Sequence, residues 1–421
     1  MSTGIAVSGH QALATAERLL DPETVLAAVS ASGGASLASG LAGTALLHAR
    51  LSTTDPVFAG AAARHWETAA VHARRYGATS AGIFSSPGGL AASLIIGSAY
   101  LPDPDSHRAV TTRAARWLSA RALALARCRE EHLRAGGAGT PWSIYDAING
   151  LAGIGRVLLA ALTLGHDMAE PGLLAALETL TTMIGARHGN RPGWWLPASE
   201  HPPTVTVHPS GAATTGMAHG IAGPLALLAT AHTAGCSVAG QRTAIQDAAQ
   251  WLLRWRTNTT SSWPPYVTGD ELDSDTAQPT TGRRDAWCYG APGIGRALTL
   301  AGRALADPQL TEAGDTAIAS LAERPTELWD VEGPTLCHGH AGVLQSAATS
   351  QDSTADRATA AVTEAFNPRL AFAFQHLDNG TAAEDPGLLT GSAGVALALA
   401  DHGQLPAPPV PARWDSILLL S

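Results

Sequence analysis

The chain has 421 residues, of which 45% are hydrophobic and 14% charged, and its formal net charge is -9. An acidic chain without a dense arginine stripe is not expected to bind nucleic acid, because nucleic-acid-binding proteins neutralise phosphates with clustered basic side chains. The sequence contains no lysine, which excludes Schiff-base chemistry and a phosphate-loop nucleotide site.

Cysteine usage and the N-terminal residues bear on the compartment. Four cysteines in so long a chain do not make a disulfide framework, and we interpret Cys128 and Cys236 as ordinary buried thiols. Residues 1–20 lack the basic region and unbroken apolar stretch of a secretory signal. No run approaches roughly 18 uncharged apolar residues, the length typical of a transmembrane helix. We therefore expect a cytoplasmic protein with no transmembrane segment.

One short pattern recurs along the whole sequence: Gly-x-x-Gly followed by an apolar, small-residue stretch. The copies are Ser39 to Leu47, Ser85 to Leu94, Asn149 to Leu159, His219 to Leu228, Tyr289 to Leu298, His338 to Ala347 and Thr390 to Leu399. In the second copy Ser86 stands at the first glycine position, whereas Gly89 keeps the second. These stretches are apolar nearly all round, which predicts fully buried helices.

Amphipathic segments alternate with the apolar ones. They are Pro56 to Tyr76, Ser106 to Arg134, Glu170 to Arg187, Val238 to Arg256, Pro308 to Glu323 and Thr354 to Gln375. Their apolar residues recur at spacings of three and four, as half-buried helices require. Alternation of buried and half-buried helices predicts an all-α fold with an inner ring of helices inside an outer ring. No composition change marks a second domain, so residues 1–421 are expected to form one.

If each inner helix begins at its glycine pair, the residues just before the glycines all lie at one mouth of the ring. Two long connections lead to this mouth, Gly189 to Gly216 and Trp263 to Arg283. Connections of this length usually shape a binding cleft. After Gln404 the composition changes, and we expect Trp414 and Leu418 to Leu420 to pack back onto the ring.

Two copies of the repeat carry a metal-binding pattern. In WCYGAPG and LCHGHAG a cysteine stands two residues before the first glycine, so Cys288 and Cys337 occupy equivalent positions, and His338 adds a third ligand. Two cysteines and one histidine form an incomplete tetrahedral zinc set that keeps a position for water or substrate, as in catalytic sites. The alternative interpretation is that the three residues are buried for packing alone.

Three further polar residues fall at the predicted mouth. His219 stands directly before Gly220, Asp146 four residues before Gly150, and Arg284 six before Gly290. Each also has an ordinary structural interpretation. In that interpretation the histidine fills space at a helix start, the aspartate caps a helix, and the arginine pairs with Asp285 or the acidic loop. The other histidines, including His188, His201, His208 and His340, are interpreted as surface or loop residues.

The motifs YDAINGLAG, MAHGIAG, WCYGAPG and LCHGHAG resemble, in order and spacing, those of the lanthionine synthetase C-like family. The resemblance covers nearly the full length, and WCYG together with CHG is its most specific part. It implies a double-layered α/α toroid of seven inner and seven outer helices. It also implies that Cys288, Cys337 and His338 are zinc ligands and that Asp146, His219 and Arg284 are active-site residues.

By this resemblance the protein is a zinc-dependent lanthipeptide cyclase. Its substrate is a dehydrated precursor peptide, and a lanthipeptide dehydratase is a candidate partner. In the implied reaction a peptide thiolate adds to dehydroalanine or dehydrobutyrine, His219 protonates the enolate, and Asp146 orients His219. Arg284 either stabilises the developing charge or positions Asp146.

Several other functions compete with this interpretation. A non-catalytic zinc protein that binds thiols such as glutathione, or acts as a scaffold, would keep the metal ligands but would not need His219 and Asp146. A prenyltransferase or terpene cyclase on a similar helical ring is disfavoured because the sequence has no DDxxD motif. A glycosidase would want two positioned carboxylates, whereas the mouth offers one obvious aspartate.

Overall fold

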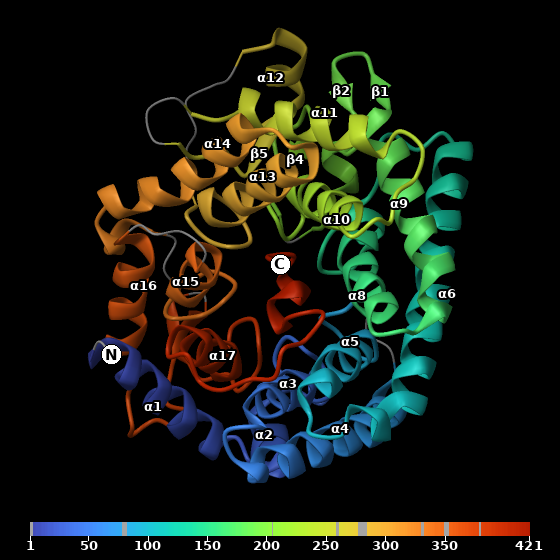
Figure 1. Ribbon diagram of the computed structural model, residues 1–421. Coiled ribbons are helices and arrows are strands. Elements are labelled where there is room, and N and C mark those ends of the chain that lie inside the picture. The colour runs from blue at the N-terminus through green and yellow to red at the C-terminus, as the bar shows by residue number, and fades with distance from the viewer. Residues whose placement is uncertain are drawn as a thin grey trace.

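The computed structural model describes residues 3–77, 82–203, 205–257, 261–276, 284–329, 332–348, 353–378 and 380–421. Most of these residues are helical. Figure 1 shows the helices in two layers around a centre that contains the C-terminal end of the chain.

The inner layer is made of the helices that follow the glycine pairs. They are α3 (Leu41–Leu51), α5 (Gly88–Gly97), α8 (Leu151–Thr163), α10 (Ala222–Thr233), α13 (Ala291–Leu305), α15 (His340–Ala347) and α17 (Ser392–His402). Each contacts the next, and the last of them, α17, contacts α3, so the described inner helices close into a ring.

Close backbone approach explains the second glycine of each pair. In every copy, a Cβ at this glycine would lie within 3.1 Å of the carbonyl oxygen six residues earlier, and in six of the seven copies within 2.7 Å, closer than a side chain tolerates. The seven glycines are Gly43, Gly89, Gly153, Gly223, Gly293, Gly342 and Gly394. The same face also meets the preceding copy, since Gly293 lies against Met217 and Gly43 against Leu388. The repeat is therefore a packing requirement of the ring.

Backbone hydrogen bonds join the segments that lead into neighbouring inner helices. The amide of Ala218 donates to the carbonyl of Cys288 over 3.2 Å. The amide of Cys288 in turn donates to the carbonyl of Cys337 over 3.4 Å. At the junction of the last and first copies, the amide of Leu389 donates to the carbonyl of Ala38 over 2.9 Å. These bonds hold equivalent positions of successive copies side by side, at the same end of their helices.

The outer layer comprises α1 (Thr3–Arg18), α4 (Pro56–Tyr76), α6 (Arg108–Arg134), α9 (Glu170–Gly185), α11 (Gln241–Arg254), α14 (Pro308–Ala319) and α16 (Ser353–Glu364). Helix α1, which the amphipathic pattern does not predict, covers α17. Helix α16 ends well before the predicted Gln375, because Pro368 disfavours helix in the residue before it.

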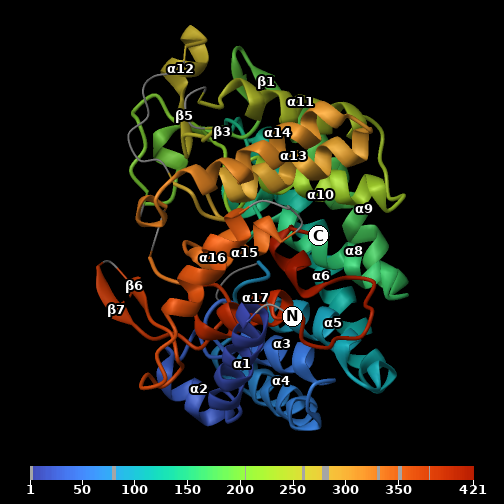
Figure 2. The same cartoon turned by 60° about the vertical axis from the view of Figure 1, so that its left-hand side comes forward.

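Short strands in the connections correct the purely helical prediction. Strands β1 (Arg187–His188) and β2 (Arg191–Pro192) pair with each other, as do β6 (His376–Asp378) and β7 (Thr381–Ala383). Between them, β3 (Trp195–Leu196), β4 (Ala212–Thr214) and β5 (Tyr266–Thr268) form an antiparallel sheet from both long connections. Figure 2 shows the β6–β7 hairpin projecting beside α16. Three shorter helices complete the α-helices: α2 (Pro22–Ala28), α7 (Trp142–Tyr145) and α12 (Gly269–Ser274).

The C-terminal residues occupy the centre of the ring, as Figure 1 shows. Trp414 is fully buried, and Leu418 to Leu420 are at most 1% exposed, in agreement with the packing predicted for them. The indole of Trp287 donates to the carbonyl of Leu418 over 2.9 Å, and Arg156 and Arg296 donate to the carbonyls of Ser421 and Leu420. The centre of the ring is therefore filled by the chain itself.

Two predictions about single features can be compared with the structure directly. Cys128 is exposed and Cys236 half-buried, so neither is the fully buried thiol that the sequence suggested; Cys128 lies on the solvent side of the outer helix α6. Within the described part of the chain, no helix has the length and apolar character needed to cross a membrane.

Candidate active site

Cys288 and Cys337 lie together because they occupy the same position in adjacent copies of the repeat. The hydrogen bond between their backbones joins the two segments, and His338 follows directly in the chain. The two Sγ atoms and a ring nitrogen of His338 all lie within 4.8 Å of one another. His338 Nε2 is 3.7 Å from Cys337 Sγ, so this nitrogen faces the thiols. The three residues form a group that could hold a metal ion.

The electrostatics of this group favour a bound cation. Burial raises the pKa of the Cys288 thiol well above its usual value, and Cys337 raises it further. Burial also opposes protonation of the His338 imidazole, but hydrogen bonding and charge from Cys288 raise its pKa to about 9. Burial therefore disfavours the thiolate form of Cys288 unless a positive charge lies beside it. A divalent metal supplies that charge, since a coordinated thiol is deprotonated outright. The residues present therefore fit a thiolate-binding metal.

His219 and Asp146 form a hydrogen-bonded pair between two copies of the repeat. The Nδ1 atom of His219 lies 2.5 Å from Oδ2 of Asp146, whose side chain is fully buried. The other carboxylate oxygen accepts the backbone N–H groups of Asn149 and Gly150, at 2.6 and 3.0 Å. Asp146 thus holds the turn before α8 and orients the histidine at the same time. The capping and site interpretations both describe it.

The short helix α7 supplies further support for His219. The Trp142 ring stacks on the imidazole, with a centroid separation of 4.9 Å and an interplanar angle of 13°. The hydroxyl of Tyr145 donates to the carbonyl of His219 over 2.8 Å. Burial raises the pKa of Tyr145 well above its usual value, so this phenol remains a donor. Because Asp146 immediately follows α7, one segment contacts the ring face, the backbone carbonyl and the Nδ1 atom of His219.

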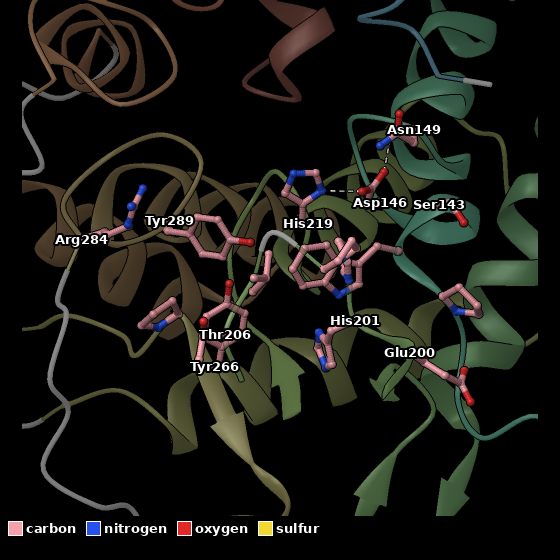
Figure 3. Close-up of a pocket in the computed structure, with 16 residues that line it drawn as sticks. Ser143, Asp146, Asn149, Glu200, His201, Thr206, His219, Tyr266, Arg284 and Tyr289 are labelled. Atoms are coloured by element: carbon pink, nitrogen blue, oxygen red, sulfur yellow. Dashed lines mark hydrogen bonds and ion pairs between the residues drawn. The ribbon is translucent and has the colours of Figure 1, made fainter. Parts of the chain in front are cut away.

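A cavity of about 840 Å³ opens beside these residues, with His219, Asp146, Arg284 and Tyr289 in its lining. Figure 3 shows His219 between Asp146 on one side and Tyr289 and Arg284 on the other. Residues of both long connections also line it: Glu200, His201, Pro202, Pro203, Val205, Thr206, Pro265 and Tyr266. Tyr289, which directly follows Cys288, links the cavity to the cysteine–histidine group.

Asp285, one of the partners that the structural interpretation of Arg284 names, forms a buried ion pair with Arg324. Both oxygens of Asp285 accept hydrogen bonds from Nη1 of Arg324, at 2.8 and 2.9 Å, and the two side chains are 0% and 10% exposed. The side chain of Arg284 lines the cavity, and its charge acts on both Tyr266 and His338. The Asp285–Arg324 ion pair anchors the segment of chain that carries Arg284 and Cys288.

One cavity residue, His201, differs from the surface interpretation drawn from the sequence, and another, Tyr289, was not singled out. His201 is not a surface residue, because it is 7% exposed and its ring meets Trp142 edge-on. Burial lowers the pKa of His201, so its ring is neutral near neutral pH. Tyr289 is buried, and burial raises the pKa of its phenol well above the usual value. Its place between Cys288 and Gly290 in the WCYG motif is the signal by which it could have been found.

Comparisons with known proteins agree with the geometry. The model of a family described as lanthionine synthetase C-like protein matches residues 31–419. The chain belongs to the lanthionine synthetase C-like family. Among curated relatives, the nisin biosynthesis protein NisC of Lactococcus lactis subsp. lactis is 27% identical over 207 residues. This alignment spans 48% of the present chain and 48% of NisC, about half of each protein.

A solved structure described as nisin cyclase resembles this lanthionine synthetase C-like protein in fold. The two superpose with a TM-score of 0.75 over 92% of this chain and 93% of the other, at 19% sequence identity. A likeness at this level of identity shows a shared fold.

Proposed function

We propose that this protein is a zinc-dependent cyclase that forms lanthionine or methyllanthionine thioether rings in a dehydrated precursor peptide. The observation that carries the proposal is the proximity of two constellations. A cysteine–histidine group suited to zinc is linked through Tyr289 to a cavity that contains the oriented His219–Asp146 pair. A thiol-binding or scaffold protein would need only the first.

The metal would be held by Cys288 Sγ, Cys337 Sγ and His338 Nε2. When bound, zinc would make a substrate cysteine thiol ionise near neutral pH, whereas a free cysteine has a pKa of about 8.5. Two cysteine thiolates in the donor set leave the substrate sulfur electron-rich, which suits attack on carbon.

In the proposed reaction the substrate sulfur attacks the β-carbon of dehydroalanine or dehydrobutyrine. The new carbon–sulfur bond replaces the carbon–carbon π bond, whose electrons form an enolate. A proton delivered to the α-carbon completes the addition and balances the proton lost by the thiol. Because Nδ1 of His219 faces Asp146, the Nε2 side of the ring is left to deliver that proton.

Arg284 is the residue proposed to stabilise the enolate. Figure 3 shows Arg284 and Asp146 on opposite sides of His219, which disfavours the alternative that the arginine positions the aspartate. The buried Tyr289 phenol, which stays protonated, is a second donor at the same wall of the cavity.

We infer that the two layers constitute the α/α toroid of seven inner and seven outer helices and that residues 1–421 form one domain. The contacts of each inner helix with the next, and of α17 with α3, support this description. The candidate partners are the precursor peptide and a lanthipeptide dehydratase.

The test is cyclisation of a dehydrated precursor peptide, followed by mass spectrometry after alkylation of free thiols. The purified protein should contain one zinc and consume free thiols without a change in peptide mass before alkylation. Cys337→Ala should lose both the metal and the activity. A wild-type protein that binds zinc and the peptide but leaves every thiol free would contradict the cyclase assignment and favour a thiol-binding protein.

A further inference from the structure

His338 is the least enclosed member of the cysteine–histidine group. Cys288 is 1% and Cys337 9% exposed, whereas the side chain of His338 is 26% exposed. A backbone hydrogen bond joins the segments of the two cysteines. That bond does not fix the orientation of the His338 ring. Its orientation therefore requires a contact from outside the donor set.

The carboxylate of Glu332 provides that contact. Its Oε2 atom lies 3.1 Å from Nδ1 of His338, on the side of the ring opposite to the nitrogen that faces the thiols. The pair is close enough for an ion pair, although Nδ1 and the carboxylate are not aligned as a hydrogen bond. The side chain of Glu332 is 40% exposed.

The backbone of Glu332 is anchored at two points. Its amide approaches the carbonyl of His338 at 3.5 Å, and its carbonyl accepts the amide of Leu377 from strand β6 over 2.6 Å. Gly333, which follows with φ of 123°, lies against Gln375 and His376 in the same part of the chain. The β6–β7 hairpin thus holds Glu332 beside the imidazole.

We propose that Glu332 is a positioning residue that orients His338 for metal binding and strengthens it as a ligand. This inference rests on the proposed metal site. A carboxylate at Nδ1 keeps the proton on that nitrogen and leaves the Nε2 lone pair directed at the metal position. Metal-binding histidines usually donate their second N–H to such a group, which makes the imidazole a stronger donor.

The carboxylate also changes the charge of the site. Zinc and two thiolates together are neutral, and Glu332 adds one negative charge next to them. A substrate sulfur in that field is more electron-rich, which favours its attack on carbon. Glu332 is not a member of the donor set itself, so its effect passes through the His338 ring.

The test measures zinc affinity of the full chain by competition with a chromogenic chelator. Glu332→Ala should weaken zinc binding roughly 10- to 100-fold, the usual effect of losing such a partner. Glu332→Gln, which keeps an oxygen acceptor without the charge, should fall between Glu332→Ala and the wild type. Glu327→Gln is the matched control, because it removes an exposed carboxylate from the same stretch of chain and should keep wild-type affinity.

The unfolding midpoint of the metal-free protein separates positioning from a general structural role, since Glu332→Ala should leave it unchanged. Equal zinc affinities in the wild type and in both Glu332 variants would overturn the inference while leaving the proposed function intact. Full zinc occupancy in Cys337→Ala would instead overturn the metal site on which both depend. Cobalt(II) spectra should keep a four-coordinate pattern in Glu332→Gln, and a change of coordination number would show that Glu332 binds the metal directly.

Discussion

The Nδ1 atom of His219 lies 2.5 Å from Oδ2 of Asp146, although the two residues are 73 positions apart in the sequence. Each lies just before an inner helix, His219 before α10 and Asp146 before α8, and these helices are neighbours in the ring. The contact is therefore a product of the repeat: equivalent segments of adjacent copies bring a histidine and a carboxylate together at the wall of the cavity.

We predict that His219→Asn retains zinc and slows ring formation by about 10²- to 10⁴-fold, the usual effect of losing a positioned acid. Asp146→Asn should act in the same direction, because the amide still accepts the backbone N–H groups before α8 but no longer carries the charge that pairs with the imidazole. The double variant should lose less than the product of the two single effects, since both act through one ring. Cyclisation by His219→Asn at the wild-type rate would show that this histidine only supports the helix start.

Trp142→Leu is expected to lower the cyclisation rate on the order of 10-fold while leaving zinc content unchanged. The stacked Trp142 ring fixes the plane of the His219 imidazole, and an aromatic pair of this kind contributes about 1 kcal/mol. Trp142→Phe retains a stacking ring and should recover most of the rate. Because Trp142 also lines the cavity, kcat and KM must be measured separately. A change confined to KM would assign the tryptophan to peptide binding alone.

Asp285→Asn should destabilise the protein by about 3 to 5 kcal/mol, because it removes the carboxylate charge that pairs with the buried Arg324 guanidinium. Denaturant unfolding of the metal-free protein measures this loss. The matched control is Glu130→Gln, which breaks an exposed pair with Arg134 and should lose about 0.5 kcal/mol or less. Similar losses in the two variants would mean that the Asp285–Arg324 pair does not hold the Cys288 segment.

Stability should fall as the pH is lowered from 7 to 5, because two buried histidines are neutral in the folded protein. Burial lowers the pKa of His48 to about 3 and that of His65 to about 4. The charge of His65 lowers the pKa of His48 further, and that of Arg64 lowers the pKa of both rings. In the unfolded chain both rings bind protons near pH 6.5, so acid favours unfolding. The loss of unfolding free energy grows as the pH falls below 6.5. It stops growing only near pH 3 to 4, where His48 and His65 bind protons in the folded protein as well.

Each of the two histidines should contribute about 2 kcal/mol to the loss of unfolding free energy between pH 7 and pH 5. Denaturant unfolding of the metal-free protein at the two pH values tests this. His48→Gln should remove roughly one half of the loss of unfolding free energy that the two histidines cause between pH 7 and pH 5. The matched control His188→Gln replaces an exposed histidine and should keep the wild-type pH dependence. An unchanged difference in His48→Gln would contradict the neutral buried state.

The ring of inner helices and its three candidate metal ligands could be predicted from the sequence, because both depend on a short pattern that recurs along the chain. The second glycine of each pair must face a carbonyl six residues earlier, so the demand for glycine recurs wherever an inner helix begins. Equivalent positions of adjacent copies then lie together, which is why the sequence predicts that Cys288 and Cys337 are neighbours. Their roles as ligands, and those of His219, Asp146 and Arg284 in catalysis, stay predictions.

Contacts between segments without a shared pattern were decided only by the tertiary structure. The order of residues does not say that Arg324 reaches Asp285, that Glu332 faces His338 or that His201 lies in the cavity wall. These side chains come from connections, whose paths depend on the helices they join and on the short strands they form. The amino-acid sequence by itself determined which positions meet around the ring, because a repeated backbone geometry requires it. Only the folded chain decided which side chains surround those positions, because a connection has no period from which its direction can be inferred.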